Sequence, residues 1–582
     1  MKMQKRLLAL CLCAALTTGL LAGCNNKNDS KKDNSSPAAT NTSLKVKPGE
    51  DNGYGWIVPE EPLHISVFGT TVQDQDKTDK DEKVMREFYE QYFNVFIDVR
   101  TFSMDNTEKL NLMLANNDYP DVLAGISDMM AEKFIAQKRA VELTDLMAEN
   151  GTNFDRRLGK YMNLLKNEEG KLYKLPIFWG ETPNVAGYNF AVRYDYWKET
   201  GLPMYETLDD YYNVLKKIVE MHPTNANGDK VYALSNNSKN DAPPNDNILN
   251  TMLAAYGFKS GYKVDPNTNE FTHWVNTPEG LEIARYVNRF YREGLIDPDF
   301  LNNDYETMLT KTFNETIVGN IGVWWHSWTA GQEKWAQEMG DDYNIEKRFI
   351  NVTIDVPGVE EPTYLNSSFL GSYRTIITNK VETKEKAAEI LRFMNWENSE
   401  LGNFIVGYGP PSDDNVWNIK DDKWIFKDNT FDNATKNENV HNVKEANGAG
   451  TIWLSASGGL LEDERIDPRV TRVSAYDFWP VNEKGEFLDE GVNLSWQHAT
   501  AKPWDSTLFA ITYDAKNPIS QVYQTVSENI ITEWAKLITS ESEEALENQF
   551  KETQAKLNQL GLEELTKFNQ ESYLKNLEKL NG

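Results

Sequence analysis

Alternating apolar and polar positions, with amphipathic segments between them, mark the region that follows residue 60. The run Leu-His-Ile-Ser-Val-Phe at 63–68 alternates strictly, which predicts a strand with one buried face. After it, Val84, Phe88 and Tyr92 recur at helical spacing. Further expected elements are a strand over 95–102, a helix over 107–116 and a strand entered at 119–123. Strands alternating with helices at this spacing predict a parallel sheet covered by helices on both faces.

Helix-start signals appear later in the chain. Thr277-Pro278-Glu279 combines a capping hydroxyl, a proline at the first helical position and an acid near the positive end of the helix dipole. The stripe Ile283, Val287 and Phe290 follows, and Gly294 is expected to end that helix. A strand over 373–378, a helix over 384–395 and a capping box at 540–543 (Ser-Glu-Ser-Glu) are the other predictions.

The first residues resemble a targeting signal. Lys2, Lys5 and Arg6 precede an apolar run at 7–20 that is too short to span a bilayer. Leu-Ala-Gly-Cys at 21–24 then matches a lipobox, where bacterial lipoproteins are cut and acylated; an ordinary signal peptide with a coincidental cysteine is the alternative. We therefore expect a signal peptide at 1–23, lipidation at Cys24 and a flexible linker over 24–59, rich in Asn, Lys, Ser and Asp at its start.

Charge and cysteine count narrow the function classes. The formal net charge of −29 over 582 residues argues against nucleic-acid binding, which needs a basic surface. Of three cysteines, Cys11 and Cys13 lie in the segment expected to be removed, which leaves no disulfide and no thiolate site. A chain of this length exceeds what one hydrophobic core normally serves, so two or more lobes are expected.

Six segments, in order along the chain, resemble the extracellular solute-binding lipoproteins of carbohydrate ABC transporters, specifically the LplA-like group of Gram-positive bacteria. They are the lipobox at Cys24, Asn117–Val122, Gly170–Pro176, Arg193–Thr207, Thr277–Pro298 and Gly319–Trp324. The resemblance implies an α/β, two-lobed periplasmic-binding-protein-like (type II) fold with a hinge. Its lobes would be discontinuous, at about 60–186 plus 372–450 and about 187–371 plus 451–582.

The resemblance also implies partners and a location. An oligosaccharide would bind between two closing lobes, and permease subunits would receive it at the cell membrane. The chain would be a monomer, lipid-anchored on the extracellular face. Relatives often carry a calcium loop after the long helix of the second lobe, but here the stretch at 222–230 lacks its leading carboxylate. No cofactor is therefore expected. A plain turn is the default interpretation of this stretch, and a calcium site is the less favoured alternative.

Candidate ligand-binding residues follow from the chemistry of sugars, which offer apolar C–H faces and a rim of hydroxyls. Aromatic platforms are expected from Trp179, Trp324, Trp325, Trp328, Trp453 and Trp479. Polar candidates are Glu181 near the first crossing, Arg374, and Thr70 and Asp128, which follow strands of the predicted parallel sheet. For each of these aromatics, core packing is the alternative interpretation.

The chain is predicted to be a binding protein and no enzyme. A secreted glycoside hydrolase would need two carboxylates facing one bond, and the 89 acidic residues single out no such pair. No zinc-protease motif, nucleophile elbow or phosphate loop is present in the sequence. A ligand sensor that feeds a surface signalling system would share the fold, so the sequence leaves that alternative open.

Overall fold

The structure is a computed structural model. It describes residues 44–69, 83–100, 106–180, 187–236, 246–323, 345–371, 373–414, 417–427, 452–457, 463–467, 503–513 and 517–581. Residues 44–582 form one compact unit, which is described below by itself.

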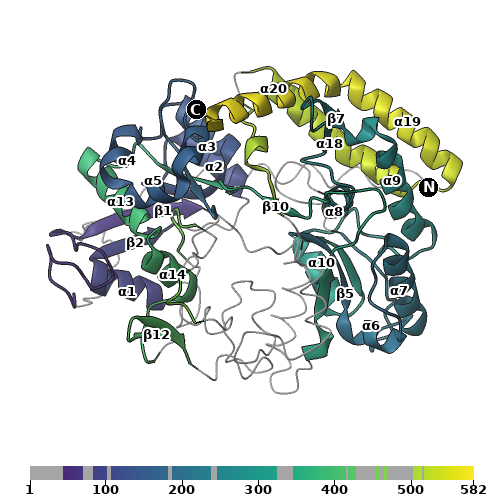
Figure 1. Ribbon diagram of the computed structural model, residues 1–582, viewed down its shortest axis with the longest axis horizontal. Helices are drawn as coiled ribbons and strands as arrows, with labels where there is room; N and C mark the ends of the chain where they lie inside the picture. Colours follow the sequence, from purple (N-terminus) through teal and green to yellow (C-terminus); the bar gives the residue numbers. More distant parts are fainter. Residues whose placement is uncertain are drawn as a thin grey trace, which may run out of the picture. The chain divides into compact units, whose positions relative to one another are not determined.

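A mixed sheet of five described strands organises the first part of this unit (Figure 1). Its order is β2-β1-β3-β11-β4, with bounds Val95–Val99, Leu63–Gly69, Val122–Ser127, Tyr373–Ile377 and Leu175–Ile177. Strand β1 pairs in parallel with both β2 and β3, which confirms the predicted parallel sheet for these three strands. Strand β11 is antiparallel to β3 and to β4, so the chain returns here from a distant segment.

Helices cover both faces of this sheet, as predicted. Leu63, Ile65 and Val67 of β1 point to one face, where they share a core with α1 (Lys83–Phe93) and α13 (Lys384–Trp396). Phe68 points to the other face, towards α2 (Asn106–Asn116) and α3 (Asp128–Ala136). The alternation seen in the sequence therefore divides one strand between two cores.

A short segment at 452–457 is tied into the first core by buried polar groups. The Glu397 carboxyl, at the end of α13, accepts hydrogen bonds from the backbone amides of Leu454 (3.2 Å) and Ser455 (2.9 Å). Asn398 donates to the Ser455 carbonyl (3.0 Å), and the Ser455 hydroxyl donates to the Pro176 carbonyl (2.8 Å). These side chains form hydrogen bonds with backbone groups of the segment 452–457, which belongs to none of the described strands. The hydrogen bonds hold the segment beside β4.

A second, antiparallel sheet carries the other large core. Its order is β8-β5-β9, with bounds Gly319–Val323, Tyr188–Arg193 and Phe349–Val352. The helices that share its core are α7 (Leu208–Met221), α8 (Asn247–Ala255), α9 (Pro278–Arg292), α18 (Ile519–Ile538) and α19 (Glu543–Gln559). Thr277 caps α9 by accepting from the Gly280 amide, which confirms the predicted helix start.

The C-terminal helices α18, α19 and α20 (Leu562–Asn581) lie beside α9 and the β6–β7 hairpin (Tyr262–Val264 and Phe271–His273) (Figure 1). Asn288 of α9 fixes the end of α18 by donating to the carbonyls of Ile538 (2.8 Å) and Ser540 (2.7 Å). The next helix is capped by Ser542, which accepts from the Ala545 amide, and not by Ser540 as the predicted capping box required. The Ser540 hydroxyl instead donates to the Lys536 carbonyl.

The packed part of the chain reaches back to Leu44, within the stretch expected to be linker. Trp56 and Val58 are buried in the first core, and Leu44, Val46 and Tyr54 pack against it. The Trp56 indole donates to the Phe93 carbonyl (3.0 Å) at the end of α1. The polar composition that predicts a linker ends before these aromatic and aliphatic residues.

The buried Glu397 predicts that stability falls as the pH rises. Burial raises its pKa to about 8, against an ordinary 4.5, although two backbone amides partly offset that effect. The folded state thus holds a proton that the unfolded state has already released. The free energy of unfolding should decrease by roughly 1.4 kcal/mol per pH unit between about pH 5.5 and pH 7 from this group, and this slope should fade as the pH passes 8.

Urea unfolding across this pH range measures the effect. Glu397→Gln should lose most of the pH slope whatever its absolute stability, whereas the exposed control Glu61→Gln should keep the wild-type slope. An unchanged slope in Glu397→Gln would contradict a protonated Glu397 in the folded state.

Candidate ligand-binding site

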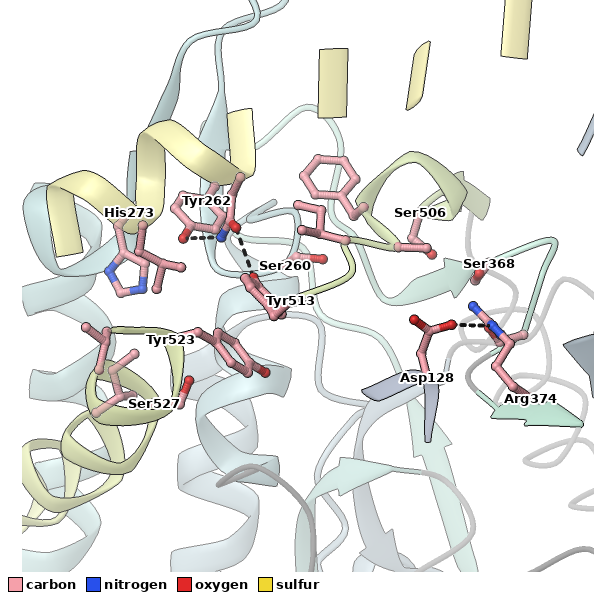
Figure 2. Close-up of a pocket in the computed structure, with 18 residues that line it drawn as sticks. Asp128, Ser260, Tyr262, His273, Ser368, Arg374, Ser506, Tyr513, Tyr523 and Ser527 are labelled. Atoms are coloured by element: carbon pink, nitrogen blue, oxygen red, sulfur yellow. Dashed lines mark hydrogen bonds and ion pairs between the residues drawn. The ribbon is translucent and has the colours of Figure 1, made fainter. Parts of the chain in front are cut away.

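A cavity of about 450 Å³ lies among residues drawn from both large cores and from the C-terminal helices (Figure 2). Asp128 and Arg374 come from the first sheet, Tyr262 and His273 from the β6–β7 hairpin, and Tyr523 and Ser527 from α18. The segment 506–513, which leads from β14 (Pro503–Asp505) towards α18, lies between them and contributes Tyr513. The cavity is thus assembled from segments far apart in the sequence.

Charged groups form one wall of the cavity. Asp128 lies where β3 ends and α3 begins, and Ser127 caps that helix. Its carboxylate accepts from Lys174 Nζ (2.8 Å), Arg374 Nε (2.8 Å) and the Thr512 hydroxyl (2.9 Å). Lys174 also contacts Glu132 (2.6 Å), so two cations are matched by two carboxylates.

The electrostatics of this wall favour ionised side chains. Burial opposes ionisation of Asp128, but the charges of Lys174 and Arg374 outweigh it and hold the pKa of Asp128 well below its usual range. The Arg374 guanidinium also donates hydrogen bonds to the carbonyls of Leu370, Gly371 and Tyr373 at 2.8–3.1 Å. The wall therefore presents a compensated ion pair rather than a free charge.

Tyrosines form the opposite wall. The rings of Tyr513 and Tyr523 stack with centroids 3.9 Å apart and an interplanar angle of 11°. Asn569 of α20 joins two tyrosines, since its carbonyl oxygen accepts from the Tyr513 hydroxyl and its amide donates to the Tyr262 hydroxyl, both at 2.9 Å. Burial raises the pKa of Tyr262 and Tyr513, so both hydroxyls stay protonated at neutral pH. Figure 2 marks the hydrogen bonds at the Tyr262 and Tyr513 hydroxyls with dashed lines.

A second cavity of about 210 Å³ adjoins the first, with His273, Ser260, Ser527 and Ile530 lining both. Its wall includes Asp246, which caps α8 by accepting from the Leu249 amide (2.8 Å). Burial raises the pKa of Asp246 to about 6. The indole of Trp504, another lining residue, donates to the Thr363 carbonyl (3.1 Å).

Together these walls suit a neutral, hydroxyl-rich molecule. Aromatic rings offer faces for C–H groups, and serine, tyrosine and amide groups can exchange hydrogen bonds with hydroxyls. A ligand with a net charge would find both cations of the first wall already paired. The volume of the first cavity falls in the range typical of small-molecule sites.

The structure brings two of the residues predicted from sequence into this site. Asp128 and Arg374 both line the first cavity and pair with each other. Trp179, expected as a platform, is instead fully buried in the first core, where its indole donates to the Ser455 carbonyl (3.0 Å). Trp453 is half-buried and packs on Phe178, with ring centroids 4.8 Å apart.

Several candidates lie outside the described residues. These are Cys24, Thr70, Glu181, Trp324, Trp325, Trp328 and Trp479. Their roles stay predictions.

The loop that corresponds to the calcium loop of relatives closes as a turn on itself. Asn225 accepts from the amides of Asn227 (3.0 Å) and Asp229 (2.9 Å) and donates to the Asn314 carbonyl (2.8 Å). Within the described residues no group of three His, Cys, Asp or Glu side chains is placed to hold a metal ion. Of the helices that the structure describes, none combines the length and apolar character needed to cross a membrane.

Sequence reasoning missed the tyrosine wall and His273. Tyr262 and Asn569 are 307 residues apart, and neither lies in a recognisable motif. The one available signal was the cluster of aromatic residues with polar tips at 256–274, which periodicity alone assigns to core as readily as to a site.

Comparisons with known proteins show which of them this chain resembles. None of the protein-family models matches it. It is 27% identical over 380 residues to lipoprotein LipO of Bacillus subtilis (strain 168), a match that covers 62% of this chain and 67% of the relative. It is 23% identical over 320 residues to the fructooligosaccharide ABC transporter substrate-binding protein FusA of Streptococcus pneumoniae, covering 52% of this chain and 54% of that protein.

Solved structures match over a larger part of the chain. FusA in complex with kestose covers 88% of this chain with a TM-score of 0.64 at 15% identity, and 99% of that structure is matched. The alginate-binding protein AlgQ2, solved without calcium ion, covers 89% with a TM-score of 0.61 at 18% identity, again with 99% matched. The predicted resemblance and fold class are thereby confirmed: the chain has the α/β, periplasmic-binding-protein-like fold of sugar-binding proteins that serve ABC transporters.

Proposed function

We propose that this chain is a substrate-binding protein that captures an oligosaccharide and delivers it to an ABC transporter permease. One observation carries the proposal. The fold extends over 88% of the chain in common with a protein solved in complex with the oligosaccharide kestose. The cavity lined by Tyr513 and Tyr523 supports it, because stacked aromatic rings beside hydroxyls and a compensated ion pair suit a neutral sugar.

The two-lobe division supports a closing mechanism. We place the first lobe at about 60–186 plus 372–450 and the second at about 187–371 plus 451–582, with one adjustment. Ile452, Leu454 and Ile466 pack in the first core, which favours assigning 452–467 to the first lobe. Open and closed forms then exchange, and a ligand that touches both lobes only in the closed form shifts the population towards it.

We further propose that the chain is anchored on the extracellular face of the cell membrane. The lipobox at Cys24 supports this, together with the likeness to a protein named as a lipoprotein. Signal cleavage after Gly23 and acylation of Cys24 would leave a polar tether before the packed region that begins at Leu44.

Two alternatives remain distinguishable by experiment. A glycoside hydrolase would need two available carboxylates facing one bond, whereas Asp128 is committed to Lys174 and Arg374. The likeness to FusA, a substrate-binding protein, also favours a binder over an enzyme. A sensor for the same ligand would differ in its partner rather than in its cavity.

Neutral plant and microbial oligosaccharides should stabilise the full-length chain against heat. A ligand at a hundred times its dissociation constant stabilises the folded state by about 2.7 kcal/mol, which raises the melting temperature by a few degrees. The measurement is a thermal-shift screen, followed by chromatography of each hit after incubation. A sugar recovered intact supports a binder and a consumed sugar an enzyme, whereas no stabilising sugar would contradict the proposed function.

Tyr523→Ala should weaken binding of such a sugar about tenfold or more, because it removes one ring of the stacked pair. Isothermal titration calorimetry measures the change. Tyr232→Ala, a half-buried tyrosine beside Lys230, is the matched control and should keep wild-type affinity. Equal affinity in Tyr523→Ala and the wild type would remove the tyrosine wall from the binding site.

Cys24→Ala should release the protein from the membrane. Without the thiol there is no site for the lipid, so the variant is expected in the medium or in the aqueous fraction of a detergent phase separation. Cys13→Ala, inside the expected signal peptide, should leave the anchor intact. Retention in the membrane fraction of a Cys24→Ala chain from which residues 1–23 have been removed would contradict lipid anchoring at this residue.

A further inference from the structure

The two cavities meet at a short stretch of shared wall. His273, Ser260, Ser527 and Ile530 line both of them. The larger cavity holds the tyrosines and the Asp128–Arg374 pair, and the smaller one holds Asp246. A ligand that extended from one cavity towards the other would therefore lie close to these four residues, His273 among them.

The imidazole of His273 has a defined hydrogen-bonding state. Its Nδ1 accepts from the backbone amide of Val275 (3.4 Å), which leaves the ring proton on Nε2. Burial lowers the pKa of His273 to about 3, so the ring stays neutral throughout the physiological range. The imidazole and the Tyr262 ring form an edge-to-face pair, with centroids 5.3 Å apart and an interplanar angle of 72°.

The Nε2–H group has no hydrogen-bond acceptor within the described part of the chain. His273 is only 6% exposed, and it lines both cavities as well as a shallower pocket between β7 and α20. An N–H group at a cavity wall without a protein acceptor is expected to bind water or a ligand. His273 is thus a neutral hydrogen-bond donor that lines both cavities.

A tight turn at 259–262 lies beside Nε2 of His273. Lys259 and Tyr262 exchange backbone hydrogen bonds at 2.8 and 3.0 Å, and the two residues between them, Ser260 and Gly261, have φ of +50° and +84°. A tight turn with two positive φ angles favours glycine, and a Cβ at Gly261 would lie 3.9 Å from His273 Nε2. The Gly261 carbonyl accepts from the Trp274 amide (3.0 Å), which holds this turn against the residue that follows His273.

We propose that His273 is a ligand-binding residue whose Nε2–H donates a hydrogen bond to a ring, glycosidic or hydroxyl oxygen of an oligosaccharide that spans both cavities. This inference rests on the proposed function and narrows its substrate class. Only a chain of at least two sugar units would occupy the tyrosine-lined cavity and the Asp246 cavity together. A monosaccharide would fill only one cavity, so it would contact either the tyrosines or Asp246 but not both.

The test uses the full-length chain in detergent and a length series of neutral oligosaccharides, from monosaccharide to tetrasaccharide, of the type that stabilises the wild type. His273→Phe keeps the ring volume but removes the donor, and it should weaken binding of the longer sugars about ten- to a hundredfold. His273→Gln keeps an amide N–H near the place of Nε2 and should recover most of that loss. His222→Phe, a histidine outside both cavities that pairs with Glu199, is the control and should bind as the wild type does.

A second measurement does not depend on the folding of any variant. In wild-type protein labelled with ¹⁵N-histidine, the Nε2 resonance of His273, identified by its absence from His273→Gln, should shift on addition of the bound sugar. An unmoved resonance, or His273→Phe binding within twofold of the wild type, would overturn the inference while leaving the proposed function intact. A wild-type protein that bound none of the sugars would overturn both.

Discussion

The contacts of one carboxylate, that of Asp128, hold the candidate site together. Asp128 lies at the carboxyl end of β3 and pairs with Lys174 and Arg374, which reach it from the segment before β4 and from β11. It also accepts from Thr512, in the segment that carries Tyr513. Because Tyr513 stacks on Tyr523 and bonds Asn569, the position of the aromatic wall is coupled to an ion pair on the first sheet. Ligands of open α/β sheets commonly bind at this edge.

The same ion pair determines what the cavity can recognise. Two buried cations beside a single carboxylate would attract anions, but Glu132 and three backbone carbonyls complete their coordination. What remains available is aromatic surface, hydroxyl groups and the neutral donor of His273. Recognition of that kind depends on shape and hydrogen bonding rather than on net charge, which agrees with the proposed binding of a neutral oligosaccharide.

Local patterns predicted the fold well and the site only in part. The alternation over 63–68 gave the two-faced first strand, and Thr277-Pro278-Glu279 gave the start of α9, because both depend on neighbouring residues. The serine that caps α19 was misplaced by two residues, since Ser540 and Ser542 both fit a capping pattern. Asp128 was a candidate because it ends a strand, and it lines the cavity. Trp179 was also a candidate, but it is buried and its indole donates to a carbonyl 276 residues away. Tyr262, Tyr513 and Asn569 meet only through tertiary packing, which no local pattern records.

The proposed function requires that the cavity between Asp128 and Tyr523 holds an oligosaccharide. A crystal structure of the protein grown with a stabilising oligosaccharide tests it most directly. We expect electron density for a sugar ring against the Tyr513–Tyr523 pair, continuing past His273 towards Asp246. Density for the sugar at another place on the protein, with this cavity holding only water, would contradict it.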